Sequence, residues 1–300
     1  MDQLTNMRIF TSVATLGSFA QAARQLRLSP SAVTRAVAQL EEQLDLTLLT
    51  RTTRSLRVTP RGAIYLESCR RILQDIEDAG RRARSEDAAP HGDMSIAAPI
   101  LFGRLHVLPI VTHLLEAHPA LRIRLVLSDR NVHLVEDGID AAIRIGELAD
   151  SSLIAVKLGE VSQMLAVSPA YLARRDAPAA PAELAGHDLI AFEGITTTSE
   201  WRFGGGASVR IEPRFAVNSA EAAIAAAEAG LGITRALSYQ VDAALRAGRL
   251  VRVLPGFEPP PVPVSALHPA SRLVSANIAA FIAAARAYFR ATPILPPPCA

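Results

Sequence analysis

The chain is poor in several residue types, and each shortage limits what it can be. Its 300 residues contain two cysteines, Cys69 and Cys299, which are too few for a disulfide framework and have no ligand-like partners nearby. No run reaches the roughly 18 apolar residues that a membrane span requires. The opening residues MDQLTNMRIF lack the charged start and apolar stretch of a secretory signal. The sequence therefore predicts a protein of the reducing cytoplasm.

Positive charge is carried almost entirely by arginine and is unevenly spread. Lys157 is the only lysine, and aromatic residues make up only 5% of the chain. Residues 1–86 hold 13 Arg against 9 Asp and Glu, a charge of +4, whereas the remainder holds 18 basic and 20 acidic residues, a charge of −2. This asymmetry favours a polyanionic partner for the N-terminal part. The preference for arginine over lysine also fits a GC-rich coding sequence.

Helix start signals divide the N-terminal part into short helices. Ser18 and Gln21 have the spacing of a capping box, which predicts a helix that ends near Leu26. Ser29 is a suitable N-cap for the next helix, and Pro30 suits the first helical position because no N–H is needed there. These signals predict two helices separated by a tight turn.

The second of these helices has one apolar face and one polar face. The polar face carries Ser31, Thr34 and Arg35 close to the helix start. A helix, a tight turn and a second helix of this kind are typical of a helix-turn-helix, whose second helix presents its N-terminal residues to base edges in the major groove. An ordinary solvated helix face would explain the same residues.

The segment LTLLTRTTRSLRV, residues 46–58, breaks the helical period and predicts two short strands around a turn near residues 53–55. Arginines recur through it and just beyond it, without an acidic residue between positions 46 and 61. Such a hairpin would suit contacts with DNA phosphates beside the helix. Thr59 and Pro60 then predict the start of a long helix to about Arg84, followed by a polar linker at 85–93.

From residue 94 onward strand and helix patterns alternate, which predicts parallel sheets covered by helices. Asn218 and Glu221 have a second capping-box spacing, and FGGGAS, residues 203–208, reads as a loop between strands. We expect strands at 94–99, 121–128, 140–146, 188–192, 214–218, 231–236 and 262–269, and helical segments at 102–119, 131–138, 220–230 and 274–289.

Residues 10–62, FTSVATLGSFAQAARQLRLSPSAVTRAVAQLEEQLDLTLLTRTTRSLRVTPRG, resemble the N-terminal winged helix-turn-helix of LysR-type transcriptional regulators almost position by position. Val58 stands where the family often has leucine. Downstream, LFGRLHVLPIV, DRNVHLVEDGIDAAIRIG, VSPAYLARR and AGLGITRALSYQV resemble the effector-binding half of the same family. The resemblance covers essentially the whole chain except its C-terminal tail.

The resemblance implies an α/β chain of three parts. They are a winged helix-turn-helix at 1–58, a linker helix for dimerisation at 59–88, and a sensor at 89–300 with the fold of periplasmic solute-binding proteins. The sensor would have one subdomain at 92–162 and 266–291, a second at 163–265, and a tail at 292–300. The implied function is transcriptional regulation without a cofactor. The implied partners are double-stranded promoter DNA, a small-molecule effector and further copies of the chain, as a homodimer or homotetramer.

Two sets of site residues follow from this organisation. For DNA they are Ser29, Pro30, Ser31, Thr34 and Arg35 on the helix, and Arg51, Thr53, Arg54 and Arg57 in the hairpin. For the effector they lie at the expected strand ends, where open α/β sheets bind ligands: Ala98, Pro99, Ile100, Ser128, Gly146, Phe192, Asn218, Ser219 and Thr234. Ser219 and Thr234 would equally serve as capping or packing residues.

One departure from the family concerns the end of the first strand of the sensor. The family commonly has a serine or threonine there that binds the anionic group of the effector, whereas this chain has Ala98 and Pro99. Arg104 and Arg144 are possible replacements as anion partners, although each is equally suited to a surface or interdomain ion pair.

Catalytic and metal motifs do not occur in the sequence. There is no GxSxG, P-loop or HExxH motif. His106, His113 and His118 have spacings that do not bring three ligands together. We therefore expect neither an enzyme nor a metal site. Two alternatives remain: a solute-binding or enzymatic α/β module with an appended DNA-binding domain, and a sequence-tolerant architectural DNA-binding protein.

Overall fold

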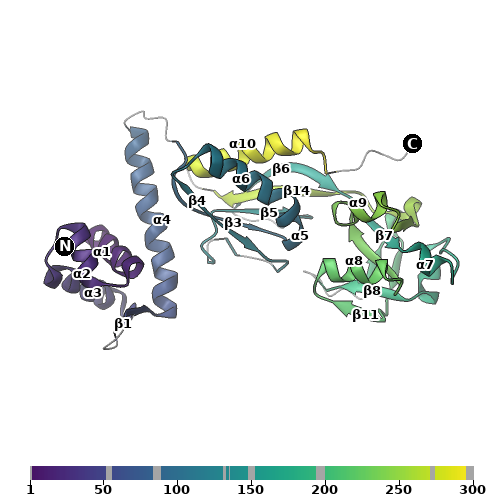
Figure 1. The fold of residues 1–300 in the computed structure, drawn as a ribbon, viewed down its shortest axis with the longest axis horizontal. Helices are drawn as coiled ribbons and strands as arrows, with labels where there is room; N and C mark the ends of the chain where they lie inside the picture. The colour runs from purple at the N-terminus through teal and green to yellow at the C-terminus, as the bar shows by residue number, and fades with distance from the viewer. Residues whose placement is uncertain are drawn as a thin grey trace. The chain divides into compact units, whose positions relative to one another are not determined.

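The computed structural model describes residues 2–51, 56–83, 89–130, 133–134, 136–147, 153–193, 200–270 and 274–294 (Figure 1). The chain divides into two compact units. The first comprises Met1–Gly92 with Glu136–Gly138, and the second comprises Asp93–Val135 with Ile139–Ala300. The linker expected at 85–93 spans the point where the chain passes from the first unit to the second.

The first unit is a helical bundle followed by a hairpin and a long helix. Three N-caps are made by side chains: Asp2 accepts from Thr5 N, Ser18 from Gln21 N and Ser29 from Ala32 N. The predicted helix starts after Ser18 and Ser29 are thus confirmed, with Pro30 in the first turn. The elements are α1 Gln3–Leu16, α2 Phe19–Leu26, α3 Pro30–Leu44, β1 Leu49–Arg51, β2 Leu56–Val58 and α4 Pro60–Ala83.

The predicted hairpin is present and is fixed to α3 by a carboxylate. β1 and β2 pair antiparallel, with Leu49 opposite Val58, and residues 52–55 between them lie outside the described part. Glu41 of α3 accepts hydrogen bonds from the backbone N–H groups of Leu48 (2.7 Å) and Leu49 (3.0 Å). Since charge-assisted hydrogen bonds are stronger than neutral ones, this contact fixes the start of the hairpin relative to the helix.

A close approach of two backbone segments explains one glycine in this unit. Gly62, in the first turn of α4, lies so near the carbonyl of Leu48 that a Cβ atom would overlap it. Thr59 completes the junction, because its hydroxyl donates to Thr47 O (2.8 Å) and accepts from Gly62 N (2.9 Å). The end of the hairpin and the start of α4 therefore form one packed corner.

The second unit contains two five-stranded sheets. The first sheet has the strand order β4-β3-β5-β14-β6. Helices α6 and α10 lie on the same face of this sheet in Figure 1, and their apolar residues belong to one core with β3 and β5. The elements are β3 Gly92–Ala98, α5 Ile100–Phe102, the π-helical turn η1 Gly103–Val107, α6 Leu108–Ala117, β4 Leu121–Leu127, β5 Ala141–Ile145, β6 Leu153–Val161, β14 Val262–Pro269 and α10 Ala276–Ala291.

The second sheet has the order β11-β8-β12-β7-β13 and is covered on both faces. Helices α8 and α9 supply Ala223, Ala227 and Val241 to one face, and Trp201 lies in the apolar cluster of the other. The elements are β7 Gln163–Val167, α7 Pro169–Leu172, η2 Pro181–Gly186, β8 Leu189–Phe192, β9 Glu200–Arg202, η3 Gly204–Gly206, β10 Ser208–Arg210, β11 Phe215–Val217, α8 Ala220–Glu228, β12 Ile233–Leu237, α9 Ser238–Arg246, β13 Val251–Val253 and η4 Pro255–Phe257.

The expectation of parallel sheets was wrong in part. β3 pairs parallel with β5, and β8 pairs parallel with β11 and β12, but β14 is antiparallel to β5 and β6, and β7 is antiparallel to β12 and β13. The reason is the path of the chain. β6 ends at Val161 in the first sheet and β7 begins at Gln163 in the second, so one extended segment joins them through Ser162. The predicted boundary at 162/163 falls at this link, and the predicted return at 265/266 falls inside β14.

Other local predictions have mixed outcomes. The seven expected strands are confirmed, as is the loop at 203–208, which separates β9 from β10. The capping box expected at Asn218 is wrong by one residue, because Ser219 is the N-cap and accepts from Ala222 N (3.3 Å). The helix expected at 131–138 is also wrong, since the described residues there form turns.

Among the described residues, one helical run, Ile100–Ala117, is long and apolar enough to cross a membrane by length and composition. Its apolar side is occupied within the second unit, because Phe102, Val107, Ile110 and Leu114 are buried in the core of the first sheet. The core helices of globular domains have the same composition. The packing of this run in the core is therefore sufficient to explain why its residues are apolar.

Candidate DNA-binding and effector-binding sites

The predicted base-reading residues lie at the N-terminal end of α3. Ser29, Pro30, Ser31 and Arg35 are exposed and Thr34 is half-buried. Ser31, Thr34 and Arg35 are spaced by three and four residues, so they share one side of the helix. The opposite side packs into the core of the first unit through Val33, Ala36, Val37 and Leu40. This leaves a polar helix face, with one guanidinium group, open to an external partner.

The predicted phosphate-binding residues are described only in part. Arg57 is exposed on β2, and Arg51 ends β1, although the placement of its side chain lies outside the described part of the structure. Thr53 and Arg54 also lie outside the described residues. Arg61 is exposed in the first turn of α4, immediately beyond the hairpin.

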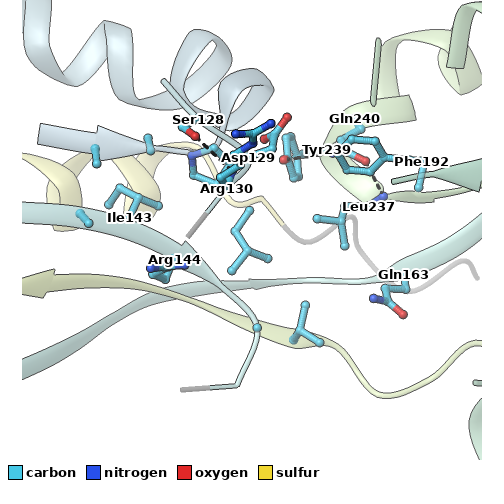
Figure 2. Close-up of a pocket in the computed structure, with 18 of the residues that line it drawn as sticks. Ser128, Asp129, Arg130, Ile143, Arg144, Gln163, Phe192, Leu237, Tyr239 and Gln240 are labelled. Atoms are coloured by element: carbon cyan, nitrogen blue, oxygen red, sulfur yellow. Dashed lines mark hydrogen bonds between the residues drawn. The ribbon is translucent and has the colours of Figure 1, made fainter. Parts of the chain in front are cut away.

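A cavity of about 330 Å³ lies within the second unit, between the two sheets (Figure 2). This volume is in the range of roughly 300–1,000 Å³ that small-molecule sites occupy. We call it the inter-sheet cavity. Its lining comes from β3, β5 and β14 of the first sheet and the residues that follow β4, from β7, β8 and β12 of the second sheet, and from α9. Its walls are mostly apolar, with polar groups at a few positions.

Five of the nine predicted effector residues line this cavity: Ala98, Pro99, Ser128, Gly146 and Phe192. They lie at or next to the ends of β3, β4, β5 and β8, as the rule for open α/β sheets expects. Gly146 has a φ of 109°, a conformation that favours glycine. The fold therefore brings together the expected ends of β3, β4, β5 and β8.

The other four predicted residues lie outside the lining. Ile100 and Asn218 are exposed. Ser219 caps α8, and Thr234 is fully buried with its hydroxyl 3.4 Å from the carbonyl oxygen of Ile190. Ser219 and Thr234 thus occupy the capping and packing positions that were the alternative interpretation of these residues.

The polar lining includes residues that sequence analysis did not name as effector contacts: Asp129, Arg130, Gln163, Arg235, Tyr239 and Gln240. In Figure 2, Asp129 and Tyr239 lie close together at one part of the cavity and Gln163 lies at another. Burial raises the pKa of the Tyr239 hydroxyl, and the nearby Asp129 carboxylate raises it further. Tyr239 therefore remains a hydrogen-bond donor at neutral pH.

Two arginines proposed as anion partners have different surroundings. Arg104 forms an ion pair with Glu221 of α8 at 2.6 Å, and both side chains are exposed. Arg144 lies on β5, lines the inter-sheet cavity, and has a pKa lowered by burial. Only Arg144 is thus placed to meet a molecule in the cavity.

Among the described residues, no group of three or more His, Cys, Asp and Glu side chains is arranged to hold a metal ion. His106 is instead half-buried among aromatic rings, and burial lowers its pKa. Cys69 is buried in the first unit, where burial raises the pKa of its thiol to about 11. A thiol of this kind stays protonated and unreactive at neutral pH.

Two family models match the chain. Residues 4–63 match the bacterial regulatory helix-turn-helix of the lysR family, and residues 87–290 match the LysR substrate-binding domain. The chain belongs to the LysR family of transcriptional regulators. Members of this family are DNA-binding regulators with an effector-binding domain rather than enzymes. The predicted family, fold class and function are thereby confirmed.

Individual LysR-type relatives match over most of their length. The chain is 32% identical over 294 residues to the HTH-type transcriptional regulator YhjC of Escherichia coli K12, covering 94% of this chain and 96% of that protein. It is 35% identical over 253 residues to the HTH-type transcriptional regulator CrgA of Neisseria meningitidis serogroup C, covering 83% and 84%.

Solved LysR-type structures share the fold. The structure of CrgA from Neisseria meningitidis matches with a TM-score of 0.61 and 30% identity, covering 95% of this chain and 98% of that one. The full-length structure of AphB, a virulence activator of Vibrio cholerae, matches with a TM-score of 0.58 and 27% identity, covering 96% and 99%.

Proposed function

We propose that this LysR-type regulator binds promoter DNA as a homodimer or homotetramer through α3 and the β1–β2 hairpin. A small molecule bound in the inter-sheet cavity would change its affinity for that DNA. The proposal places the chain in the cytoplasm, where it has access to promoters. The effector must bind one arrangement of the chain more tightly than another, because a ligand with equal affinity for both shifts no equilibrium.

The observation that carries the DNA-binding part is the exposed side of α3. Ser31, Thr34 and Arg35 lie in its first two turns, while the opposite side is fixed in the core. No described acidic side chain pairs with Arg35, so its guanidinium group is available for a base edge. Arg57 on the hairpin supports a second kind of contact, because exposed arginines beside a recognition helix bind phosphates.

The test compares two arginine substitutions on two kinds of DNA. A preferred duplex is first selected from a random pool with the full-length protein. Arg35→Ala is expected to lose on the order of 1–3 kcal/mol of binding free energy on that duplex and little on random duplexes. Arg57→Gln is expected to weaken binding on both and to reduce the salt slope by about 1.

Arg210→Ala serves as the matched control, because Arg210 is an arginine of β10 in the second unit. It should leave both affinities unchanged. Equal losses on selected and random duplexes for Arg35→Ala would reject base reading by α3. If selection from the random pool yields no preferred duplex at all, the chain is a sequence-tolerant DNA-binding protein and the proposal is wrong.

A further inference from the structure

Glu41 places a carboxylate on the same side of α3 as Thr34, one of the proposed base-reading residues. Seven residues are nearly two full turns of a helix, so the two side chains lie above one another, about 10 Å apart along the helix axis. Both are half-buried, whereas Val37 and Leu40 between them are buried in the core of the first unit. A carboxylate beside a DNA-binding surface repels phosphates, so Glu41 would weaken DNA binding if it acted through its charge alone.

The carboxylate is instead directed at the base of the hairpin. One oxygen atom, Oε1 of Glu41, accepts hydrogen bonds from the backbone N–H groups of both Leu48 (2.7 Å) and Leu49 (3.0 Å). The side chains of Leu48 and Leu49 are buried in the core of the first unit. Apolar packing has no directional preference, whereas hydrogen bonds to a charged acceptor are both directional and strong. Glu41 therefore constrains the direction in which β1 leaves α3.

The hairpin depends on such constraints because it is short. β1 and β2 pair through three residues each, and a two-stranded hairpin of this size is only marginally stable alone. Thr59 supplies a second constraint, since its backbone N–H donates to Leu48 O (2.9 Å) and its hydroxyl donates to Thr47 O (2.8 Å). The base of the hairpin is thus held both by α3 and by the residue that precedes α4.

The position of Arg57 depends on the base of the hairpin. Arg57 lies opposite Thr50 in the pairing of β1 with β2, and Thr50 directly follows Leu49, one of the two donors to Glu41. The side chain of Arg57 is exposed, so the hairpin backbone decides where its guanidinium group can meet a phosphate. A movement of β1 relative to α3 therefore moves Arg57 relative to the base-reading residues.

We propose that Glu41 is a positioning residue for DNA binding, which holds Arg57 at the distance from α3 that a base contact and a neighbouring phosphate contact require together. This inference rests on the proposed function, in which α3 reads bases and the hairpin binds phosphates. α3 keeps its own place without Glu41, because Val33, Val37 and Leu40 hold it in the core. Loss of Glu41 therefore weakens the phosphate contact of Arg57 and leaves the base preference intact.

The full-length protein is compared with Glu41→Ala and Glu41→Gln in binding to the selected duplex and to random duplexes over a range of salt concentrations. Glu41→Ala should weaken binding to both by about tenfold at roughly 0.1 M salt, the contribution of one phosphate contact, and should reduce the salt slope by about 1. The ratio of the two affinities should stay the same. Glu41→Gln keeps an acceptor oxygen at the same reach, so its values should be intermediate. A loss of stability alone, measured by circular dichroism, would change neither the slope nor the ratio.

Glu42→Gln is the matched control, because Glu42 is the next residue of the same helix and is exposed. It removes the same charge and should leave binding unchanged or slightly tighter, since phosphates are repelled less. Repulsion alone would make Glu41→Ala bind more tightly as well, and that result would overturn the proposal. If Glu41→Ala does not fold, Glu41→Gln is compared with Glu42→Gln, which has lost the same charge. Glu41→Gln should then bind more weakly, and equal affinities would overturn the proposal.

A double-mutant cycle with Arg57→Gln locates the effect and separates two kinds of failure. Arg57→Gln should reduce the salt slope by about 1 in the unsubstituted protein, and by less than about half of that when Glu41→Ala is already present. Equal reductions in both backgrounds would reject the role of Glu41 and leave the proposed function standing. No reduction in the unsubstituted protein would instead reject phosphate binding by the hairpin, and the proposed function and this inference would both be wrong.

Discussion

His106 shows how one half-buried residue makes the stability of the second unit depend on pH. Its ring lies 4.8 Å from the ring of Phe102, 5.7 Å from Tyr239 and 5.8 Å from Phe289, measured between centroids. Nε2 is buried without a hydrogen-bond partner, and Nδ1 lies 3.4 Å from the hydroxyl of Tyr288. Burial lowers the pKa of His106 below its ordinary value of 6.5, because these surroundings disfavour the charged imidazolium.

The sign of the pH effect follows from that shift. The unfolded chain binds a proton at this histidine more readily than the folded chain, so stability should fall as pH drops below about 6.5. His106→Phe keeps an aromatic ring in the cluster and removes the titration. We expect its melting temperature to decrease less than that of the unsubstituted protein between roughly pH 7.5 and pH 5.

The comparison is made as a difference between the two proteins, because His187 also has a pKa lowered by burial and by Arg175. That second histidine is present in both, so its contribution cancels. Parallel pH profiles for the two proteins would show that His106 is not held neutral by its surroundings.

At the scale of single residues, the roles that depend only on nearby residues in the sequence were predicted correctly. Ser18, Ser29 and Pro30 were assigned correctly because capping depends on neighbours three residues away. Arg235 was not identified as a residue of the cavity lining, because its position depends on the register of β12 with β7, which are distant in sequence. A lone arginine in the apolar run of β12 was the available signal.

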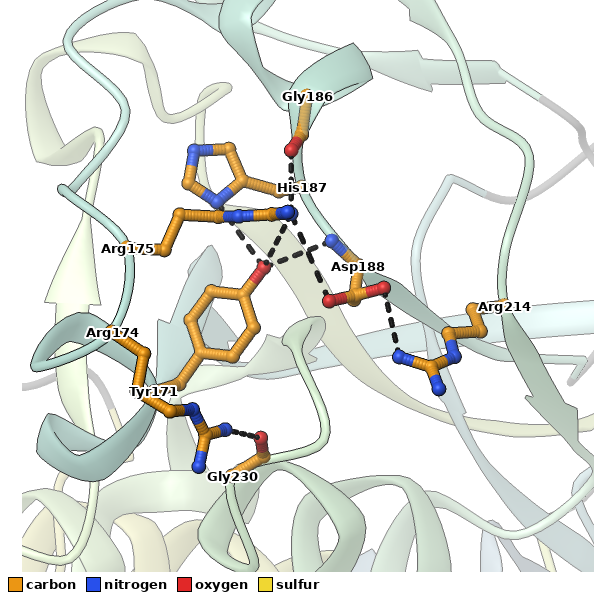
Figure 3. A network of polar contacts seen from close by, with 8 residues as sticks. All are labelled: Tyr171, Arg174, Arg175, Gly186, His187, Asp188, Arg214 and Gly230. Atoms are coloured by element: carbon orange, nitrogen blue, oxygen red, sulfur yellow. Dashed lines mark hydrogen bonds and ion pairs between the residues drawn. The ribbon is translucent and has the colours of Figure 1, made fainter.

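At the scale of elements, a network of polar contacts joins α7, η2 and the start of β8 away from the inter-sheet cavity (Figure 3). The hydroxyl of Tyr171 accepts a hydrogen bond from Asp188 N at 2.9 Å and lies 3.4 Å from both Arg175 Nη1 and His187 Nδ1. Asp188 also forms ion pairs with Arg175 at 3.7 Å and Arg214 at 3.1 Å. The network holds a short helix whose four residues would not be stable alone.

Tyr171→Phe tests this arrangement. Removal of the hydroxyl leaves the Asp188 N–H without its acceptor in a partly buried position, which should cost about 1–3 kcal/mol of unfolding free energy. Urea unfolding of the full-length protein, followed by circular dichroism, measures this loss. Tyr288→Phe is the control and should cost less, because the closest contacts of its hydroxyl are longer, at 3.4 Å and 3.5 Å. Equal losses in the two variants would show that the network does not stabilise α7.

Elements were predicted more reliably than their directions. Seven apolar strands of the two sheets were expected because β-branched and aliphatic runs bounded by turn residues are distinctive, whereas β7 and β13 of the second sheet were not expected. β6 was not expected, since its burial follows no alternation and several of its residues are exposed. The antiparallel pairing of β14 with β5 and β6 was not expected either. This pairing depends on the path of the chain between the two sheets, which the local sequence pattern does not show.

At the scale of the whole molecule, α4 carries apolar residues that the described part of the first unit does not bury. Ile64, Ile72 and Ile76 are 64%, 39% and 38% exposed, whereas Leu66 and Cys69 of the same helix pack into the core of the first unit. Exposed apolar residues that recur along one side of a helix suit association with another helix. A second copy of α4 is the occupant expected under the proposal that this regulator binds DNA as a dimer or tetramer.

The substitution Ile64→Glu combined with Ile72→Glu should therefore convert the protein to a monomer in sedimentation velocity, because four buried carboxylates would face one another across a symmetric helix pair. Binding to the selected duplex should fall by about 100-fold or more, since two linked DNA-binding units gain that much from simultaneous contact. Phe215→Glu, at a residue of β11 that is 36% exposed in the second unit, controls for the charge and should keep the oligomeric state. An unchanged sedimentation coefficient in the double variant would place the dimer contact elsewhere, and the DNA-binding unit would then have to be paired through the second unit alone.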